Sequence, residues 1–207
     1  MTRPYVQRAR AEAAAETRRQ VLEAARAAVL ADGRLEFGVG EIAAAAGVAR
    51  STVYAAFGSR AGLLAALADE TLHRAGLETV IAEYMRPDPV DALEHSLVAS
   101  CRMYAADHRV FGRLLMLRAV DPEAVAPLAR SLDDRAIGMA SLAERLDGAG
   151  RLRPELSRER AAHVLWVLTS FWTFDELFSG RNLDADGCAR ILIEMARSTL
   201  LVARADD

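Results

Sequence analysis

Residues 39–62 constrain the fold of this chain more than any other stretch, because they predict two short helices, a tight turn between them and the start of a third helix. Gly47 stands at the turn, where glycine can take a positive φ without steric strain. Ala43 comes four residues before Gly47 and Val53 six residues after it, a spacing that permits a close crossing of the two helices. The stretch therefore predicts a helix-turn-helix.

The second helix of this motif is expected to bury one side and expose the other. A small apolar core would hold the motif together, formed by Ile42, Ala46, Val48, Val53 and Phe57. The opposite side carries side chains that can reach bases and phosphates, namely Arg50, Ser51, Thr52 and Tyr54. Because the N-terminal turn of a recognition helix enters the major groove, we expect these four residues to contact DNA.

Each of these residues also has a purely structural interpretation. Tyr54 would pack into the small core, and Arg50 would be a solvated charge. Ser51 and Thr52 would do no more than cap the helix. The sequence leaves these alternatives open.

The motif resembles the DNA-binding domain of the TetR family of transcriptional regulators. The matching positions are Ile42-Ala43, Ala46-Gly47-Val48, Thr52-Val53-Tyr54, Phe57 and Ser59-Arg60, and upstream Thr17-Arg18, Val21-Leu22, Ala24-Ala25 and Gly33. The resemblance implies a homodimeric repressor that binds a double-stranded DNA operator and responds to a small-molecule effector. It also implies that Arg60 meets a DNA phosphate.

Three departures from the family pattern bear on this interpretation. Gly38 and Gly40 stand where a helix cap and a first turn are expected, so the start of that helix is expected to be weak. Arg60 replaces the lysine that the family more often has, and Ala61 replaces the acidic residue that usually follows. Arginine still supplies a positive charge for a phosphate, with a planar set of donors.

Composition and charge favour an all-α protein with a basic N-terminal third. The 207 residues are 52% hydrophobic and 27% charged, and apolar residues recur at helical spacing without alternating runs of β-branched residues. Residues 1–62 hold nine arginines against six acids (+3), whereas residues 63–207 hold seventeen against twenty-three (−6). Only the N-terminal third is suited to a polyanion.

No sequence motif indicates catalysis, a metal site, a cofactor or a membrane span. The four histidines lack the spacing of a metal site, and no phosphate loop or dinucleotide fingerprint is present. Cys101 and Cys188 are expected to be buried thiols. Residues 1–16 lack the apolar core of a signal peptide, and no run approaches the roughly 20 apolar residues of a membrane span. We therefore expect a cytoplasmic protein that is not an enzyme.

Two domains are expected, a helix-turn-helix domain over residues 1–62 and an effector-binding and dimerisation domain over residues 63–207. Periodicity and cap residues predict helices over residues 16–32, 59–84, 89–107, 111–120, 123–147, 157–178 and 184–203. Residues 1–15 carry three arginines and are interpreted as a flexible arm or as an extension of the first helix. Such an arm is either a solvated tail or a contact to the DNA backbone or minor groove.

The C-terminal part predicts a subunit interface and a ligand pocket. Residues 164–174 place apolar groups on every face of a helix, which one small domain cannot cover alone, so a partner subunit is expected. The last predicted helix, residues 184–203, is expected to share this two-fold interface, with Leu192 as a candidate contact. Aromatic and flexible side chains in this part are either plain core or the lining of a pocket for an apolar or aromatic molecule, namely Met103, Tyr104, His108, Phe111, Met116, Trp166, Phe171 and Trp172. The main alternative is a helical architectural DNA-binding protein without an effector, and the remaining one is a helical enzyme.

Overall fold

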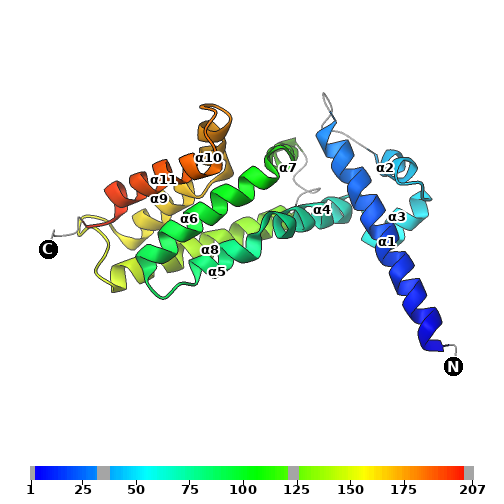
Figure 1. Cartoon of the computed structure of the whole chain (residues 1–207), viewed down its shortest axis with the longest axis horizontal. Coiled ribbons are helices and arrows are strands. Elements are labelled where there is room, and N and C mark those ends of the chain that lie inside the picture. The colour runs from blue at the N-terminus through cyan, green and yellow to red at the C-terminus, as the bar shows by residue number, and fades with distance from the viewer. Residues whose placement is uncertain (1–2, 32–37, 121–125, 203–207) are drawn as a thin grey trace. The chain divides into compact units, whose positions relative to one another are not determined.

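The computed structural model describes the backbone of residues 3–31, 38–120 and 126–202, and the side chains of residues 8–31, 38–117 and 132–202 (Figure 1). Helices form nearly all of this part of the chain, and its only β-type pairing is an isolated bridge between Leu152 and Leu201. The all-α prediction is therefore confirmed.

The helices follow one another along the chain with short connections. They are α1 (Arg3–Leu30), α2 (Val39–Ala45), α3 (Arg50–Phe57), α4 (Arg60–Ala75), α5 (Leu77–Tyr84), α6 (Pro89–Ala106), α7 (His108–Val120), α8 (Ala126–Gly148), α9 (Arg158–Leu168), α10 (Phe171–Phe178) and α11 (Ala185–Leu200).

The chain divides into two compact units. The first comprises residues 1–71 and 109–128, and the second comprises residues 72–108 and 129–207. The boundary thus falls inside α4, and a later segment of the chain returns to the first unit. The division at residue 62 into a DNA-binding and an effector domain remains a prediction about function.

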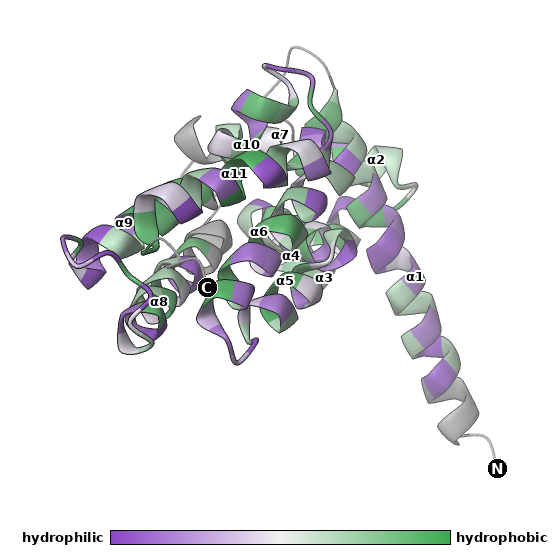
Figure 2. Cartoon of the chain, turned by 60° about the vertical axis from the view of Figure 1, so that its left-hand side comes forward, coloured by the Kyte–Doolittle hydropathy of each residue, from purple (hydrophilic) through white to green (hydrophobic). Residues whose placement is uncertain are grey.

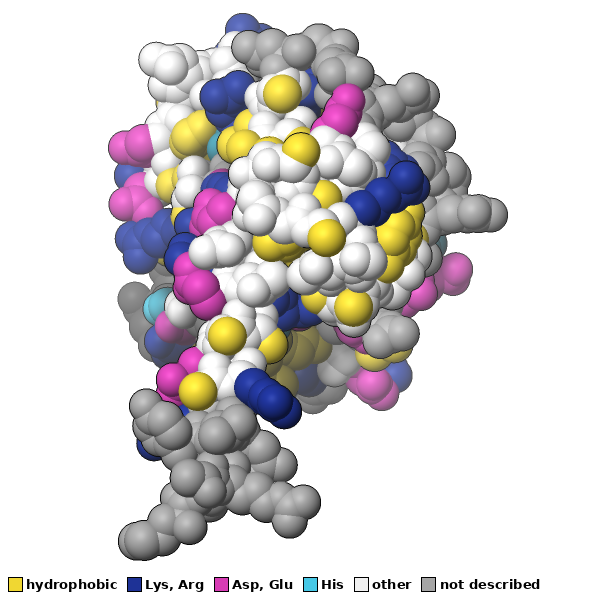
Figure 3. All heavy atoms as spheres, turned by 90° about the vertical axis from the view of Figure 1, so that its right-hand side faces the viewer, with side chains coloured by type: hydrophobic (Ala, Val, Ile, Leu, Met, Phe, Trp, Pro, Cys, Tyr) yellow, Lys and Arg dark blue, Asp and Glu magenta, His cyan; other side chains and the backbone are white. Residues whose placement is uncertain are grey.

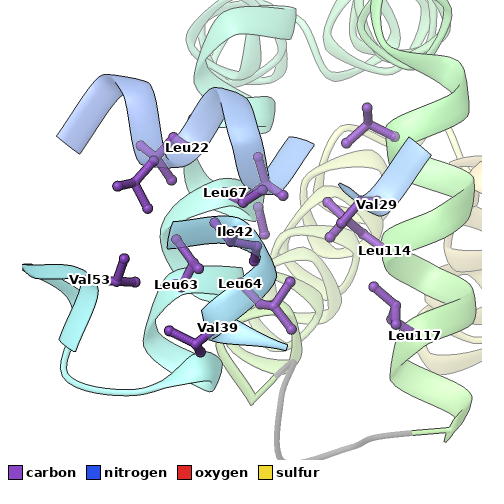
Figure 4. Packing of buried hydrophobic residues seen from close by; sticks show 14 of the residues in the cluster. Leu22, Val29, Val39, Ile42, Val53, Leu63, Leu64, Leu67, Leu114 and Leu117 are labelled. Atoms are coloured by element: carbon purple, nitrogen blue, oxygen red, sulfur yellow. The ribbon is translucent and has the colours of Figure 1, made fainter. Parts of the chain in front are cut away.

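The first unit is built around one apolar cluster. Figure 4 shows Val53 of α3, Ile42 of α2 and Leu22 of α1 pointing toward Leu63, Leu64 and Leu67 of α4. Ile42 and Val53 are each 1% exposed, and Ala46, Val48 and Phe57 pack against the cluster from its edge. The small core predicted for the helix-turn-helix is therefore confirmed, with α1 and α4 completing it.

Helix α7 also belongs to this core, which the sequence did not predict. Val110, Leu114 and Leu117 are buried in the cluster. Arg113 on the same helix donates to the carbonyl oxygens of Val29 (2.9 Å) and Ala31 (2.5 Å) at the end of α1. The last carbonyl groups of an α-helix find no N–H donor within the helix. Arg113 supplies donors from another helix and so caps the C-terminal end of α1.

The second unit contains two cross-linked helix pairs. Helices α6 and α11 are joined by a bidentate ion pair between Arg197 and Glu94, with both N–O distances 2.6 Å. Helices α5 and α8 are joined by Tyr84, whose hydroxyl donates to the carbonyl oxygen of Gly138 at 2.8 Å. Arg145 of α8 returns a hydrogen bond to the carbonyl of Tyr84 at 2.9 Å.

Two predicted helices are each broken in two. The helix expected over residues 59–84 ends at Ala75, because Gly76 takes a left-handed conformation with φ of 101° before α5 begins. The helix expected over residues 157–178 ends at Leu168, and Ser170 starts α10 by accepting a hydrogen bond from the amide of Trp172. A single capping residue such as Ser170 can end one helix and start another, although the residues around it remain apolar. Hydropathy alone therefore did not reveal this break.

The helix starts predicted at Ser59, at Asp88-Pro89 and at Asp184 are confirmed, and each has a side-chain cap. Ser59 Oγ accepts from the amide of Gly62 at 2.9 Å, Asp88 accepts from two amides of α6, and Asp184 accepts from the amide of Gly187 at 2.6 Å. Helix α1 extends back to Arg3, so the N-terminal arm is helical from that residue (Figure 1). Figure 2 shows hydrophilic and hydrophobic segments alternating along the coloured part of this helix. The predicted end of the first helix at Gly33 and the break at Asp121-Pro122 lie outside the described residues.

Candidate nucleic-acid interface and ligand site

The turn between α2 and α3 has the geometry that the sequence predicts. Gly47 has a φ of 67°, and the amide of Val48 donates to the carbonyl of Ala43 at 3.0 Å. Ala43 is only 3% exposed, which confirms that it faces the neighbouring helix. The sequence predicted a weak start for α2 because Gly38 has no side chain to cap it. Glu41 partly stabilises this start, since its carboxylate accepts a hydrogen bond from the amide of Gly38.

Helix α3 turns its apolar side into the core and its polar side outward. Val53 is buried, whereas Arg50 and Ser51 are exposed and Thr52 is half-buried. Tyr54 is 38% exposed, so its ring lies at the surface and not in the core. Ala49 is the N-cap and makes no side-chain cap bond, so Ser51 and Thr52 lie in the first turn without capping it.

Arg50 and Tyr54 form a pair on the exposed side of α3. Arg50 Nη2 donates to the hydroxyl oxygen of Tyr54 at 3.1 Å, and its guanidinium lies 5.4 Å from the centre of the tyrosine ring. The two residues are one helical turn apart, which is the separation at which side chains on a helix meet. This pair orients a planar donor group at the start of the helix.

Arg18 of α1 holds the other end of α3. Its Nη1 donates to the carbonyl oxygen of Ala56 at 3.2 Å, and its guanidinium lies 4.5 Å from the ring centre of Phe57. A donor at the last turn satisfies one of the carbonyls that a helix leaves unpaired. Arg18 therefore fixes the orientation of α3 on the first unit.

Arg60 and Gly62 follow at the start of α4. Arg60 is the first residue of that helix, where the helix dipole favours a bound phosphate. A Cβ atom placed on Gly62 would lie 2.0 Å from the carbonyl oxygen of Phe57, so only glycine fits there. The sequence reasoning missed this close approach, although Gly62 stands three residues after the Ser59 cap.

Positive charge on this unit is distributed over separate side chains. Figure 3 shows a face on which separate dark blue arginine groups and magenta acidic groups are scattered among apolar and uncharged atoms. From Ile42 to Ala68 the chain contains no acidic residue and only Arg50 and Arg60 as basic ones. This part of the surface therefore attracts a polyanion without a competing carboxylate on the same segment.

The predicted ligand residues are brought together only in part. Within the second unit, Tyr104 of α6 meets Phe171 of α10 edge to face, with ring centres 5.5 Å apart. His108 stacks on Phe171 at 5.5 Å, and Trp172 lies 5.3 Å from the same ring. Met103 is buried on α6. Two rings outside the predicted set, Phe174 and Phe178, complete this aromatic cluster.

Phe111 and Met116 are not part of that cluster. Both lie on α7 in the first unit, where Phe111 is buried and Met116 is 46% exposed. His108 is held at the edge of the cluster by Asp175, with 2.6 Å between Nε2 and Oδ1, and by the hydroxyl of Ser179. A polar group among these rings is an anchor of the kind that orients a bound molecule.

Trp166 lies against an arginine that the sequence did not single out. The guanidinium of Arg135 on α8 is 3.6 Å from the centre of a Trp166 ring. Its Nη1 donates to the carbonyl oxygen of Trp166 (3.2 Å) and to Oγ1 of Thr169 (3.1 Å). Spacing along the chain could not reveal this contact, because 31 residues separate its two partners.

The described residues contain no group of three or more histidine, cysteine or acidic side chains that could hold a metal ion. None of the described helices is long and apolar enough to cross a membrane. Both cysteines are buried, as the sequence predicted. Burial raises the pKa of the Cys101 thiol to about 12.

Comparison with known proteins identifies relatives that share this motif. A family model described as bacterial regulatory proteins, tetR family, matches residues 21–67. The HTH-type transcriptional repressor LfrR of Mycolicibacterium smegmatis is 35% identical over 172 residues, which span 81% of this chain and 82% of that protein. The HTH-type transcriptional repressor BepR of Brucella suis biovar 1 is 29% identical over 191 residues, which span 86% of this chain and 88% of that protein.

Solved structures share the fold over nearly the whole chain. NalD, the secondary repressor of the MexAB-OprM multidrug efflux pump in Pseudomonas aeruginosa, superposes with a TM-score of 0.73 at 24% identity. The match covers 94% of this chain and 100% of that chain.

Proposed function

The chain belongs to the TetR family of bacterial transcriptional regulators, and from this premise we propose that it is a homodimeric repressor released from a palindromic operator by an apolar or aromatic small molecule. The family and the two curated relatives are DNA-binding regulators and not enzymes. The operator symmetry, the dimer and the effector are our proposals.

The observation that carries the proposal is the orientation of α3. Val53 anchors one side of this helix in the core, and Arg18 holds its end, so Arg50 and Tyr54 project from a rigid support. A recognition helix needs such a support, because its base contacts depend on a fixed entry angle into the major groove. Arg50, Ser51 and Thr52 are proposed to read bases, while Tyr54 and Arg60 position the protein on phosphates.

Exposed apolar side chains on the last three helices support a dimer. Val167 is 57% exposed, Trp172 is 45% exposed and Met195 is 46% exposed. These residues lie on α9, α10 and α11, which pack together in the second unit. Large apolar side chains on adjacent helices mark an association surface, and two copies related by a two-fold axis would cover it. The dimer would then present two copies of α3 to two half-sites.

Release by a small molecule requires coupling between two sites. A ligand weakens operator binding only to the extent that it prefers the shape of the protein that does not fit DNA. The aromatic cluster around Phe171 is proposed as the ligand site, because it combines rings with the polar groups of His108 and Tyr104. Linkage then demands that operator DNA weaken ligand binding by the same factor.

Sequencing the genomic fragments retained by the purified protein tests this function. A repressor is expected to enrich a short inverted repeat and to protect it as one discrete footprint. Retention of fragments without a shared sequence would instead indicate an architectural DNA-binding protein. The operator so identified is then the probe for effector release, where an active compound must lower operator affinity and must itself bind less tightly when operator DNA is present.

A further inference from the structure

Arg135 carries a partly buried positive charge, and within the described residues only one of its three guanidinium nitrogens has hydrogen-bond partners. Within the described part of the chain, both hydrogen bonds of its guanidinium come from Nη1, to the carbonyl of Trp166 and to the hydroxyl of Thr169. Its Nε is fully buried and has no hydrogen-bond partner there. A buried donor without a partner costs about 1–3 kcal/mol, and more when the group is charged. If Arg135 served only to join α8 to α9, its buried Nε would be expected to have a hydrogen-bond partner as well.

Among the residues that the structure describes, the charge of Arg135 also lacks a counter-ion. The described contacts of its guanidinium are all with uncharged groups, namely the ring and carbonyl of Trp166 and the hydroxyl of Thr169. Two further uncharged side chains meet Thr169: Tyr104 donates its hydroxyl to the carbonyl of Thr169 at 3.1 Å, and the hydroxyl of Thr169 lies against the sulfur of Met139. Burial accordingly lowers the pKa of Arg135 and raises the pKa of Tyr104, because the charged form of each is poorly solvated.

The partners of Arg135 also connect it to the aromatic cluster. Tyr104 bonds to the same threonine as the arginine and meets the ring of Phe171 at 5.5 Å. The ring of Trp166 covers the guanidinium itself, a stacking that holds the fork in place and partly offsets the loss of water. A cation with unsatisfied donors therefore stands beside a cluster of aromatic rings.

We propose that Arg135 is the charge-recognising residue of a ligand site that takes aromatic molecules carrying an acidic group, such as a carboxylate or a sulfonate. The acidic group supplies the missing counter-ion and accepts hydrogen bonds from the unsatisfied side of the guanidinium. The aromatic part of the ligand packs against the rings of Trp166 and Phe171. This inference rests on the proposed effector function and narrows it, since the same site rejects lipophilic cations, which meet a like charge there.

A pair of fluorescent probes tests the charge preference directly. 1-Anilinonaphthalene-8-sulfonate and N-phenyl-1-naphthylamine share one ring system, and only the first carries the sulfonate. We expect the wild-type protein to bind the sulfonate about tenfold more tightly at low salt, and the Arg135→Met protein to bind both probes about equally. Arg160, which is exposed on α9, provides the matched control, because Arg160→Met removes an arginine without altering the preference.

The tryptophan signal locates the bound probe. We expect energy transfer from tryptophan to the bound probe to be largely lost in a Trp166→Phe protein. A Trp172→Phe protein should retain most of this transfer. The proposal is wrong if wild type binds both probes with equal affinity, or if Arg135→Met keeps the preference for the sulfonate while its circular dichroism remains native.

A second measurement on the unaltered protein covers the case in which Arg135→Met does not fold. Here 1-naphthoate and 1-naphthamide compete for the bound sulfonate probe, and the carboxylate must displace it at about tenfold lower concentration. Equal competition overturns the charge preference. Operator binding is measured separately. If the protein binds a palindrome but shows no preference for the anionic compounds, this inference alone is wrong. If it binds no discrete operator, the proposed function is wrong.

Discussion

Arg50 donates a hydrogen bond to the hydroxyl of Tyr54, one turn further along the recognition helix, at 3.1 Å. The pairing holds the guanidinium at the exposed start of α3 before any DNA is bound. If Arg50 contacts a base as proposed, it loses less rotamer freedom on binding than an unpaired arginine would, which favours binding. The pair thus links a local helix contact to the proposed readout of sequence.

Removal of the Arg50 side chain is expected to relax sequence preference. If Arg50 bonds to a guanine edge, Arg50→Ala costs about 1–3 kcal/mol on the best operator and much less on an operator altered at the contacted base. Binding of both proteins to a panel of single-base operator variants measures this. Equal weakening across the whole panel would show that Arg50 meets only phosphate.

Arg60→Ala is expected to act differently, because a phosphate contact carries no sequence information. All DNA sequences should be bound more weakly by a similar factor. The slope of log affinity against log salt concentration should fall by about 0.9 for each phosphate that the arginine neutralises in the wild-type complex. Titrations at several salt concentrations provide the slope, and an unchanged slope with unchanged affinity would remove Arg60 from the interface.

Gly62→Ala is expected to destabilise the first unit. The added Cβ would lie 2.0 Å from the carbonyl oxygen of Phe57, so the start of α4 or the end of α3 must shift, at a cost of about 1–3 kcal/mol. Gly40→Ala is the matched control: it lies in α2 with open space around it, and alanine there should stabilise by about 0.5–1 kcal/mol. Thermal melting of the three proteins compares them, and equal melting temperatures for both variants would contradict the packing argument.

Met195→Glu is expected to dissociate the proposed dimer. Leu192, which the sequence alone places equally well at an interface, is 1% exposed, so a charge there would disrupt the subunit itself. Met195 is 46% exposed on the same helix, and Met85 is 67% exposed beyond the end of α5 and serves as the control. Light scattering at micromolar concentration should report a monomer for Met195→Glu and a dimer for Met85→Glu. Operator affinity should fall with dissociation, because two half-sites are no longer bound together.

The Cys101 thiol is expected to make stability depend on pH in the alkaline range. Burial raises its pKa to about 12, whereas an unfolded thiol ionises near about 8.5. Between these values the folded state keeps a proton that the unfolded state releases, so stability decreases as pH rises. The stability difference between wild type and Cys101→Ala should therefore shrink from about pH 8.5 upward. Urea unfolding at several pH values measures it, and a pH-independent difference would mean that the thiol is not buried in solution.

Features that depend on near neighbours in the chain could be predicted from the sequence. The turn at Gly47, the helix starts at Ser59, Asp88 and Asp184, and the apolar side of α3 each involve residues within about one helical turn of one another. Their geometry is set by backbone sterics and short-range hydrogen bonds, which the residue types largely determine. The sequence by itself therefore determined the all-α class and the helix-turn-helix.

Features that depend on packing between distant segments could not be predicted from the sequence. Arg113 caps α1 across 84 residues of sequence, and Arg135 stacks on Trp166 across 31 residues. The same holds for whether Leu192 or Met195 faces outward on α11. Hydrophobic periodicity shows that a helix has an apolar side, but several neighbours can cover that side with similar burial. Which neighbour does so, and which charge is left without a counter-ion, depends on the arrangement of all helices at once.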